Sequence, residues 1–221
     1  MFVMDDREEI LEQIEEPIEM QKEKHSFLYD IYSLLHDLVY ILAAITLIFV
    51  FCVRLVGVSG ASMNPTLHDG DYLALQSNVI MGDLERGDII VARELTFRDG
   101  EPIVKRVIAT EGQLVQIKYD DGVLRVFVDG IRLEEDYINN GRMLTEYFFN
   151  DNDGNPNQFS MTVSKDCIFV MGDNRDNSAD SRDPSIGEIH IDQVMGKVLF
   201  VVLPGADSNG KRDFSRFGAV S

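Results

Sequence analysis

The chain has 221 residues, 45% of them hydrophobic, and a formal net charge of −18 at pH 7. This length allows one membrane segment and one catalytic domain of moderate size, with enough apolar residues for a core. The net negative charge disfavours nucleic acid as a partner, because binding phosphate requires clustered lysine and arginine. The same charge would not hold the protein to anionic lipid, so attachment to a membrane would have to come from apolar burial.

The N-terminal part of the chain combines an acidic segment with an apolar run. Residues 1–53 hold 3 basic and 11 acidic side chains. We interpret residues 1–37 as an acidic tail, in which a helix could begin near Ser26. Residues 38–53 are an uncharged run of 16 residues, which spans about 24 Å as a helix and falls short of a hydrocarbon core of about 30 Å.

A transmembrane helix over residues 38–58 closes this gap, with the Arg54 side chain reaching to the membrane interface. A cleaved secretory signal is disfavoured, because the run begins some 37 residues into the chain and follows an acidic region. A buried core helix stays open as an alternative.

Beyond Gly70 the pattern changes to short apolar runs bounded by glycine and aspartate, and no helical periodicity of useful length follows residue 58. The runs predict strands over residues 72–75, 88–92, 113–119, 123–128, 167–171 and 197–203. The turn Asp120-Asp-Gly122 predicts a hairpin between two of them. Residues 150–158 are expected to form a surface loop.

We therefore expect a mainly β fold, in which one N-terminal transmembrane helix precedes an all-β catalytic domain, residues 59–221, of bent antiparallel sheets with a small β-hairpin insertion. Cys52 lies in the apolar run and Cys167 in a predicted strand. These positions are poorly suited to pairing, so we expect no disulfide and a packing role for both.

Candidate nucleophiles need a base, because a serine hydroxyl is a poor nucleophile at neutral pH. Four histidines are present: His25, His36, His68 and His190. His25 lies in the tail and His36 just before the apolar run, His68 follows Ser62 by six residues, and His190 has no obvious acidic partner nearby in the sequence. A Ser/His/Asp triad is defined by geometry and stays open.

Lysine can replace histidine as the base when it is neutral. Its reference pKa of about 10.4 must then fall to about 7–8, a difference of roughly 3–5 kcal/mol, and burial in an apolar pocket is the means. Lys105 is flanked on both sides by branched aliphatic residues in the predicted strand 102–108. A lysine in a strand is usually solvent-facing, so this position alone is weak support.

Three segments in chain order carry a resemblance to a known family. They are Ser59-Gly-Ala-Ser-Met-Asn-Pro-Thr66, Val104-Lys-Arg-Val107 and Gly172-Asp-Asn-Arg-Asp-Asn-Ser-Ala-Asp-Ser-Arg182. Together they resemble the type I signal peptidases, the leader peptidase family of membrane-anchored serine proteases with a Ser/Lys dyad. The resemblance covers roughly residues 38–203, and the short distance from Lys105 to Gly172 is similar to Gram-positive-like single-anchor members.

The resemblance implies roles for individual residues. Ser62 is the nucleophile, and Lys105 is the general base that also protonates the departing amine. Ser178 orients the lysine, and Met63 packs beside the substrate pocket. The Ser62 N–H contributes to the oxyanion hole, and Gly60 stands where some members carry a serine that supplies the second donor.

The remaining motif residues are expected to fix the loop around the dyad. Asp180 and Arg182 should form an ion pair that Arg106 shares, with the carboxylates turned away from Lys105. The motif positions implied by the resemblance are Met63, Arg106, Asp173, Asn174, Arg175, Asp180 and Arg182.

The resemblance implies a membrane-bound serine endopeptidase that removes N-terminal signal peptides after small residues of Ala-x-Ala type, through an acyl-enzyme. It implies a cytoplasmic tail, an extracytoplasmic catalytic domain, and no cofactor or metal. Its partners would be preprotein signal peptides, the lipid bilayer and the secretion machinery. Two alternatives stay open: an inactive membrane-tethered interaction protein, and a dedicated Ser/Lys processing peptidase for one substrate. Self-cleaving repressors are disfavoured, because they are soluble and carry a DNA-binding module.

Overall fold

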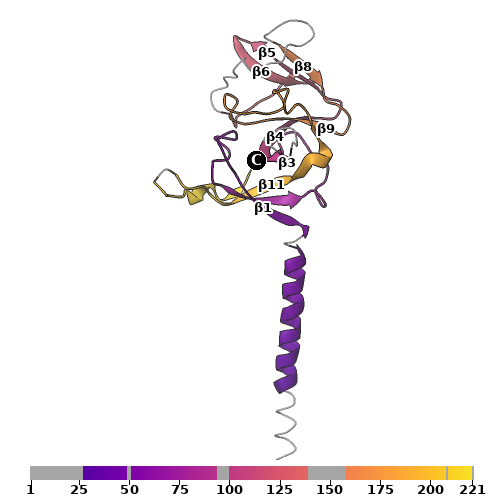
Figure 1. Cartoon of the computed structure of the whole chain (residues 1–221), viewed down its shortest axis with the longest axis vertical. Helices are drawn as coiled ribbons and strands as arrows, with labels where there is room; N and C mark the ends of the chain where they lie inside the picture. The colour runs from indigo at the N-terminus through magenta and orange to yellow at the C-terminus, as the bar shows by residue number, and fades with distance from the viewer. Residues whose placement is uncertain (1–26, 49–50, 94–99, 139–157, 208, 221) are drawn as a thin grey trace, which may run out of the picture. The chain divides into compact units, whose positions relative to one another are not determined.

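The computed structural model of the chain describes residues 27–48, 51–93, 100–138, 158–207 and 209–220 (Figure 1). The chain divides into two compact units, residues 1–50 and 51–221. Most of the predicted acidic tail, and almost all of the surface loop predicted over residues 150–158, lie outside the described residues.

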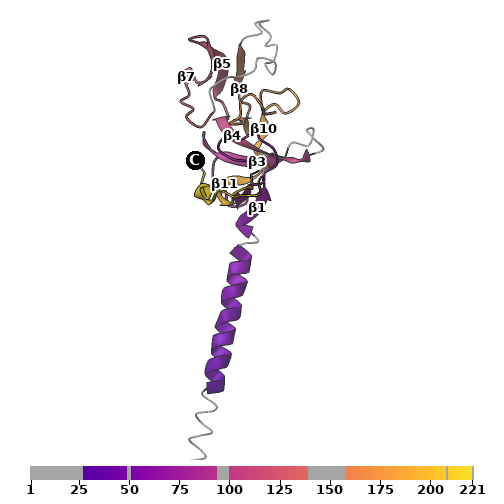
Figure 2. The ribbon, with the colours of Figure 1, turned by 90° about the vertical axis from the view of Figure 1, so that its left-hand side faces the viewer.

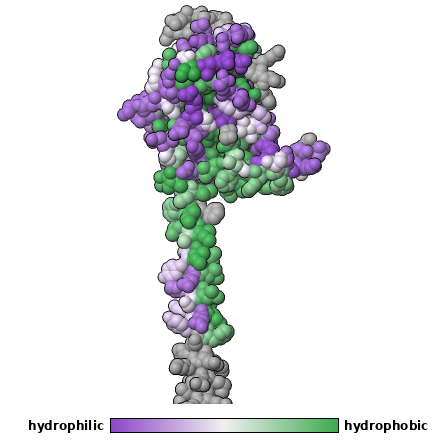
Figure 3. Space-filling view, turned by 180° about the vertical axis from the view of Figure 1, so that it is seen from behind, coloured by the Kyte–Doolittle hydropathy of each residue, from purple (hydrophilic) through white to green (hydrophobic). Residues whose placement is uncertain are grey.

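The first unit contains the helix Phe27–Ile48, which is long and apolar enough to cross a membrane. Its 22 residues span about 33 Å at 1.5 Å per residue, which matches a hydrocarbon core of about 30 Å. All of its residues are exposed rather than packed in a core, and Figure 3 shows a largely hydrophobic helix surface with hydrophilic residues on one side. Apolar burial of this helix therefore requires lipid or another chain.

The structure corrects both ends of the helix predicted over residues 38–58. The helix is present from Phe27, the first described residue, in agreement with the helix expected from near Ser26, and Asp30 and Asp37 lie within it with exposed side chains. At the other end, residues Val53–Gly57 form strand β1, which pairs antiparallel with the following strand. A run of uncharged residues marks apolar character, and it does not mark where helix gives way to strand.

The second unit consists of two antiparallel sheets with little helix. The larger sheet has eight strands in the order β1-β2-β11-β3-β4-β9-β10, with β12 paired to β11. Its further strands are β2 (Tyr72–Ser77), β3 (Ile89–Arg93), β4 (Pro102–Thr110), β9 (Cys167–Met171), β10 (Ile189–His190), β11 (Val194–Leu203) and β12 (Gly218–Ala219). The short 3-10 helices are η3 (Ile191–Gln193) and η4 (Phe214–Arg216).

The smaller sheet has four strands in the order β7-β6-β5-β8. These strands are β7 (Ile131–Arg132), β6 (Val123–Val128), β5 (Leu114–Asp120) and β8 (Phe159–Thr162). Figures 1 and 2 place this sheet at the opposite end of the unit from β1. The predicted hairpin is confirmed: Asp120 pairs with Val123, and Asp121 (φ 51) and Gly122 (φ 79) form a two-residue turn with positive φ at both positions.

Irregular pairing bends the larger sheet. The register of β11 shifts twice against β2, and the register of β4 shifts once against β9. Such bulges kink a strand and increase its twist, so the sheet can fold around its own core. The expected mainly β fold with bent antiparallel sheets is confirmed, whereas β1, β7, β8, β10 and β12 were not predicted. Both cysteines are free, as expected.

Candidate active site

Ser62 and Lys105 meet in the second unit, although 43 positions separate them in the sequence. Ser62 lies on the connection between β1 and β2, and Lys105 lies in the middle of β4. The Lys105 Nζ atom is 2.9 Å from Ser62 Oγ and donates to the Val104 carbonyl oxygen at 2.9 Å. Lys105 is only 3% exposed. The pair has the separation that proton transfer between a nucleophile and its base requires.

The connection that carries Ser62, residues 58–71, is named here the nucleophile loop. Backbone hydrogen bonds close its base, because the Val58 N–H donates to the Asp71 carbonyl oxygen at 2.7 Å and the Gly70 N–H donates to the Val58 carbonyl oxygen at 2.9 Å. Met63 and Leu67 are buried in one core cluster. The loop is therefore tied at both ends and anchored in the middle by apolar side chains. The packing role predicted for Met63 is consistent with this burial.

Gly60 lies two positions before Ser62 in a conformation that favours glycine, with φ of 92°. Its N–H donates to Asp69 Oδ1 at 2.8 Å, so this group is already used inside the nucleophile loop. Gly60 shapes the turn and has no free donor for an oxyanion. In contrast, no acceptor among the described residues lies within hydrogen-bonding range of the Ser62 N–H, and this donor can serve a substrate oxygen.

The polar segment 172–182, named here the polar loop, packs its first residue directly against the backbone of Ser62. A Cβ atom on Gly172 would lie 2.2 Å from Ser178 Oγ and 2.5 Å from the Ser62 carbonyl oxygen. Asn174 holds the same backbone, since its N–H donates to the Ser62 carbonyl oxygen and its Nδ2 donates to the Ala61 carbonyl oxygen, both at 3.0 Å.

Ser178 is buried beside this contact and donates from its hydroxyl to Asp180 Oδ2 at 2.7 Å. The Gly172 N–H donates to the same oxygen at 2.9 Å. Ser178 is thus oriented by Asp180 and lies next to the backbone of Ser62. Its predicted role in orienting Lys105 stays a prediction.

Two buried arginine–carboxylate pairs fix the polar loop. Arg182 engages Asp180 through two hydrogen bonds of 2.8 and 2.9 Å, so the expected pair is present. Arg106 does not share this carboxylate and instead makes two hydrogen bonds of 2.9 and 2.8 Å to Asp173. The reason is strand register: Arg106 pairs with Met171 at the end of β9, which places it beside the start of the polar loop.

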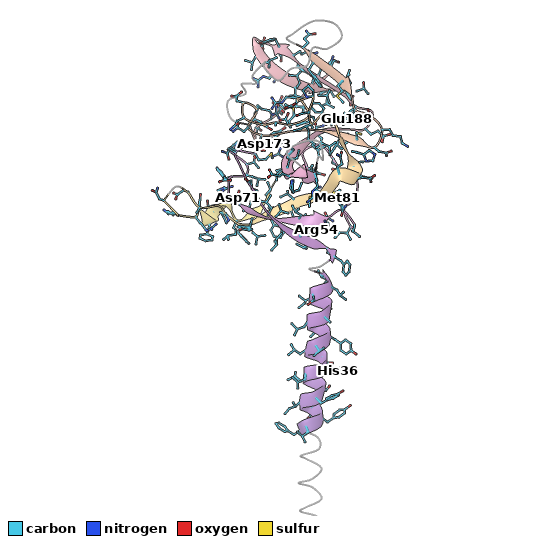
Figure 4. The ribbon with its side chains drawn as sticks, viewed as in Figure 1. His36, Arg54, Asp71, Met81, Asp173 and Glu188 are labelled. Carbon is cyan, nitrogen blue, oxygen red and sulfur yellow. The ribbon has the colours of Figure 1, made fainter. Side chains whose placement is uncertain are left out.

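Asp173 also connects the polar loop to the nucleophile loop, because Thr66 Oγ1 donates to Asp173 Oδ2 at 2.5 Å. Figure 4 shows Asp173 within the unit, and it is 1% exposed. Asp173 and Asp180 therefore each face an arginine, as the prediction of a neutral Lys105 requires. A buried pair of this kind specifies geometry more than it adds net stability.

Sequence reasoning missed two residues that complete the network. Glu135 pairs with Arg175 at 2.6 Å, and Arg175 Nε donates to the Gly172 carbonyl oxygen at 3.1 Å. The Tyr137 ring lies 4.0 Å from the Arg106 guanidinium carbon. Burial, together with the charge of Glu135, raises the pKa of Tyr137, so the phenol stays neutral. Glu135 and Tyr137 lie in the acidic stretch 134–137, and nothing in its local sequence distinguishes it from a solvated loop.

The Asp180 pairing predicts how the fold responds to acid. Burial alone would raise the pKa of Asp180, but Arg182, the Gly172 N–H and the Ser178 hydroxyl outweigh burial and hold the pKa below its usual range. A carboxyl with a lowered folded-state pKa contributes stability that is fully present above its unfolded pKa of about 3.9 and is lost as pH falls through the folded value. We expect the free energy of unfolding to fall below about pH 4 for this reason.

Urea denaturation between about pH 2 and pH 6 checks this expectation. The Asp180→Asn variant should lose stability at neutral pH and show a weaker decline in acid than wild type. Asp176→Asn, at an exposed position of the same loop, should keep the wild-type decline. If the free energy of unfolding of Asp180→Asn fell with decreasing pH as steeply as that of wild type, Asp180 would not be the source of the acid sensitivity.

The histidine alternative gains no support from the described residues. His68 donates its backbone N–H to Asp71, and no described histidine hydrogen-bonds Ser62. His190 is exposed, and its Nδ1 accepts from the Asp192 N–H at 3.2 Å. His36 lies on the helix of the first unit, and His25 lies outside the described residues.

The sequence model of a family described as "Signal peptidase, peptidase S26" matches residues 31–203. The chain belongs to the signal peptidase family, peptidase S26. It is therefore a serine endopeptidase, and the predicted resemblance to type I signal peptidases is confirmed.

Curated relatives agree with this family. The chain is 36% identical over 148 residues to signal peptidase I T of Bacillus subtilis (strain 168), which covers 66% of this chain and 72% of the relative. It is 34% identical over 184 residues to signal peptidase IB of Staphylococcus aureus (strain N315), which covers 78% and 91%. A crystal structure of a signal peptidase I from Enterococcus faecalis V583 is 26% identical, covers 53% of this chain and 97% of that one, and has a TM-score of 0.38.

Proposed function

We propose that this chain removes N-terminal signal peptides from exported preproteins, with Ser62 as the nucleophile and Lys105 as the general base. The observation that carries the proposal is the 2.9 Å separation of Ser62 Oγ and Lys105 Nζ in a member of the signal peptidase family. Cleavage after small residues of Ala-x-Ala type follows from the resemblance of its three motifs to type I enzymes.

The chemistry runs through an acyl-enzyme. Neutral Lys105 accepts the hydroxyl proton as Ser62 Oγ attacks the carbonyl carbon of the scissile bond. The resulting oxyanion accepts a hydrogen bond from the Ser62 N–H. Lys105 then transfers its proton to the leaving amine, which departs as the N-terminus of the mature protein. Lys105 then takes a proton from a water molecule that attacks the ester carbonyl, and it returns this proton to Ser62 Oγ as the signal peptide departs with a free carboxylate.

The surroundings of Lys105 favour a neutral amine. Burial disfavours the charged form of a lysine, and this side chain is 3% exposed. The two buried carboxylates of the polar loop, Asp173 and Asp180, are each paired with an arginine. Their negative charge is thus directed toward a permanent cation.

We further propose that the helix Phe27–Ile48 anchors the protein in the lipid bilayer. The catalytic unit would lie on the extracytoplasmic side, because exported preproteins present their cleavage sites there, and the part of the predicted acidic tail that precedes this helix would lie in the cytoplasm. Contact with the secretion machinery would bring substrate to the enzyme.

The test is cleavage of a preprotein with an Ala-x-Ala site by the full chain in detergent micelles. We expect a new N-terminus directly after the second alanine, found by mass spectrometry of the product. A preprotein with phenylalanine in place of that alanine should not be cut, and a Ser62→Ala form prepared in parallel controls for contaminating peptidases.

Absence of cleavage by wild type would overturn the proposal and favour the inactive membrane-tethered protein. Cleavage of one preprotein among a broad panel would favour the dedicated processing peptidase.

A further inference from the structure

The end of the chain, beyond the family match to residues 31–203, contacts the nucleophile loop. Residues 204–220 are named here the C-terminal segment. Arg216, on η4, engages Asp71 through two hydrogen bonds, from Nη1 to Oδ1 at 3.0 Å and from Nη2 to Oδ2 at 2.6 Å. Asp71 is the last residue of the nucleophile loop, and its side chain is fully buried.

The same carboxylate collects donors from both segments. Asp71 Oδ1 accepts from the Gly205 N–H at 2.7 Å, and Oδ2 accepts from the His68 N–H at 2.8 Å. Gly205 also packs on the loop so closely that a Cβ atom there would lie 2.1 Å from the Asp69 carbonyl oxygen. Asp71, labelled in Figure 4, is therefore the junction between the C-terminal segment and the nucleophile loop.

Two local interactions hold Arg216 in place for this pairing. The Asp213 side chain caps η4 by accepting from the Ser215 N–H at 3.0 Å. On the other side, β12 pairs with β11 through Phe200↔Ala219 and Val201↔Gly218. The backbone of Arg216 is thus held on one side by the capped turn η4 and on the other by strand β12. This fixes the position from which its guanidinium reaches Asp71.

A cleft between the two segments borders this junction, because His68, Gly205 and Arg216 also line it. It has a volume of about 730 Å³, and its walls include Asn64 and Asp69 from the nucleophile loop and Lys211 and Asp213 from the C-terminal segment. Continuous packing does not join the two segments here. In the described structure, the hydrogen bonds between the two segments all end on the Asp71 carboxylate, beside the close approach of Gly205 to Asp69.

The charge balance makes this restraint sensitive to Arg216. Burial alone would raise the pKa of Asp71, but Arg216 and the two backbone N–H groups outweigh burial and lower it. The carboxylate is consequently charged, and removal of its only arginine partner in the described structure leaves this buried charge with the backbone N–H groups of His68 and Gly205 and no cation. The loop then has to move to bring that charge to water.

We propose that Arg216 is a positioning residue for the nucleophile: by pairing with Asp71 it fixes the base of the nucleophile loop and so keeps Ser62 beside Lys105. This inference rests on the proposed function of Ser62. It gives the C-terminal segment, which lies outside the family match, a part in the geometry of the active site.

The experiment compares Arg216→Gln and Arg216→Lys with Arg132→Gln, a matched change at an exposed arginine of the small sheet. We expect Arg216→Gln to lower kcat by about 10-fold or more, since small displacements of reacting groups are costly, with KM within about twofold. Arg216→Lys should recover part of kcat, because it restores the charge. Arg132→Gln should match wild type.

Three further readouts separate positioning from stability. The kcat of each variant is divided by the folded fraction found from its thermal unfolding curve. In an Asp71→Asn background, Arg216→Gln should cause no additional loss of kcat, because the pair is already broken. Amide hydrogen exchange within residues 58–71 should increase in Arg216→Gln and stay at the wild-type level in Arg132→Gln.

An unchanged kcat per folded molecule together with unchanged exchange in the nucleophile loop would overturn the inference. Wild type that fails to cut any preprotein would contradict the proposed function, and the exchange data would still decide whether Arg216 restrains the loop.

Discussion

Replacing Lys105 with methionine is expected to reduce kcat for preprotein cleavage by about 10²–10⁴-fold, the usual contribution of a general base. Methionine has a similar length and fills the same buried space, but it cannot accept the proton from Ser62 Oγ, which lies 2.9 Å from Nζ in the wild type. Because the change removes a polar group from a site that is 3% exposed, the thermal unfolding midpoint should stay equal or rise.

The measurement is single-turnover cleavage of the Ala-x-Ala preprotein at saturating enzyme, with circular dichroism to verify the fold. Lys165→Met, at a side chain that is 81% exposed, is the matched control and should retain wild-type kcat. A folded Lys105→Met enzyme with wild-type kcat would place the base elsewhere, and His68, the described histidine closest in sequence to Ser62, would be the next candidate.

Replacing Gly172 with alanine is expected to lower kcat by about 100-fold or more and to destabilise the fold by about 1–3 kcal/mol. The new Cβ atom would lie 2.2 Å from Ser178 Oγ and 2.5 Å from the Ser62 carbonyl oxygen. The Ser62 carbonyl cannot swing aside, because the Asn174 N–H binds it at 3.0 Å. The effect is steric, and it acts on the nucleophile through its own backbone.

Gly82→Ala controls for the loss of a glycine as such, since a Cβ atom there would meet nothing within 4 Å. This variant should keep both wild-type kcat and wild-type stability. The free energy of unfolding from urea titration and the kcat from the preprotein assay are measured for both variants. Retention of wild-type kcat by Gly172→Ala would show that the polar loop does not constrain Ser62.

A buried network of hydrogen bonds connects the segments around Ser62. Arg106, Asp173 and Thr66 connect β4, the polar loop and the nucleophile loop in one series of hydrogen bonds. Arg182 and Asp180 hold the other end of the polar loop. Non-additive effects are expected for variants within this series, because the residues share partners.

Features encoded by neighbouring residues could be predicted from the sequence alone. The turn at Asp121 and Gly122 follows from short-range backbone preferences, and the pairing of Asp180 with Arg182 spans two positions. An apolar helix near the N-terminus follows from composition. Ser62 and Lys105 were predicted as partners through the resemblance of three motifs, and the structure brings them within hydrogen-bonding distance.

Tertiary structure alone decided the features that depend on strand register and on contacts between distant segments. Strand β1 exists because Val53–Gly57 finds β2 as a partner, and no local pattern separates it from the end of a helix. Arg106 selects Asp173, 67 positions away, because β4 pairs with β9 in one register. Arg216 and Asp71 are 145 positions apart. Such pairs form only where the whole fold brings the two partners together in a buried site, and no short stretch of sequence specifies that meeting.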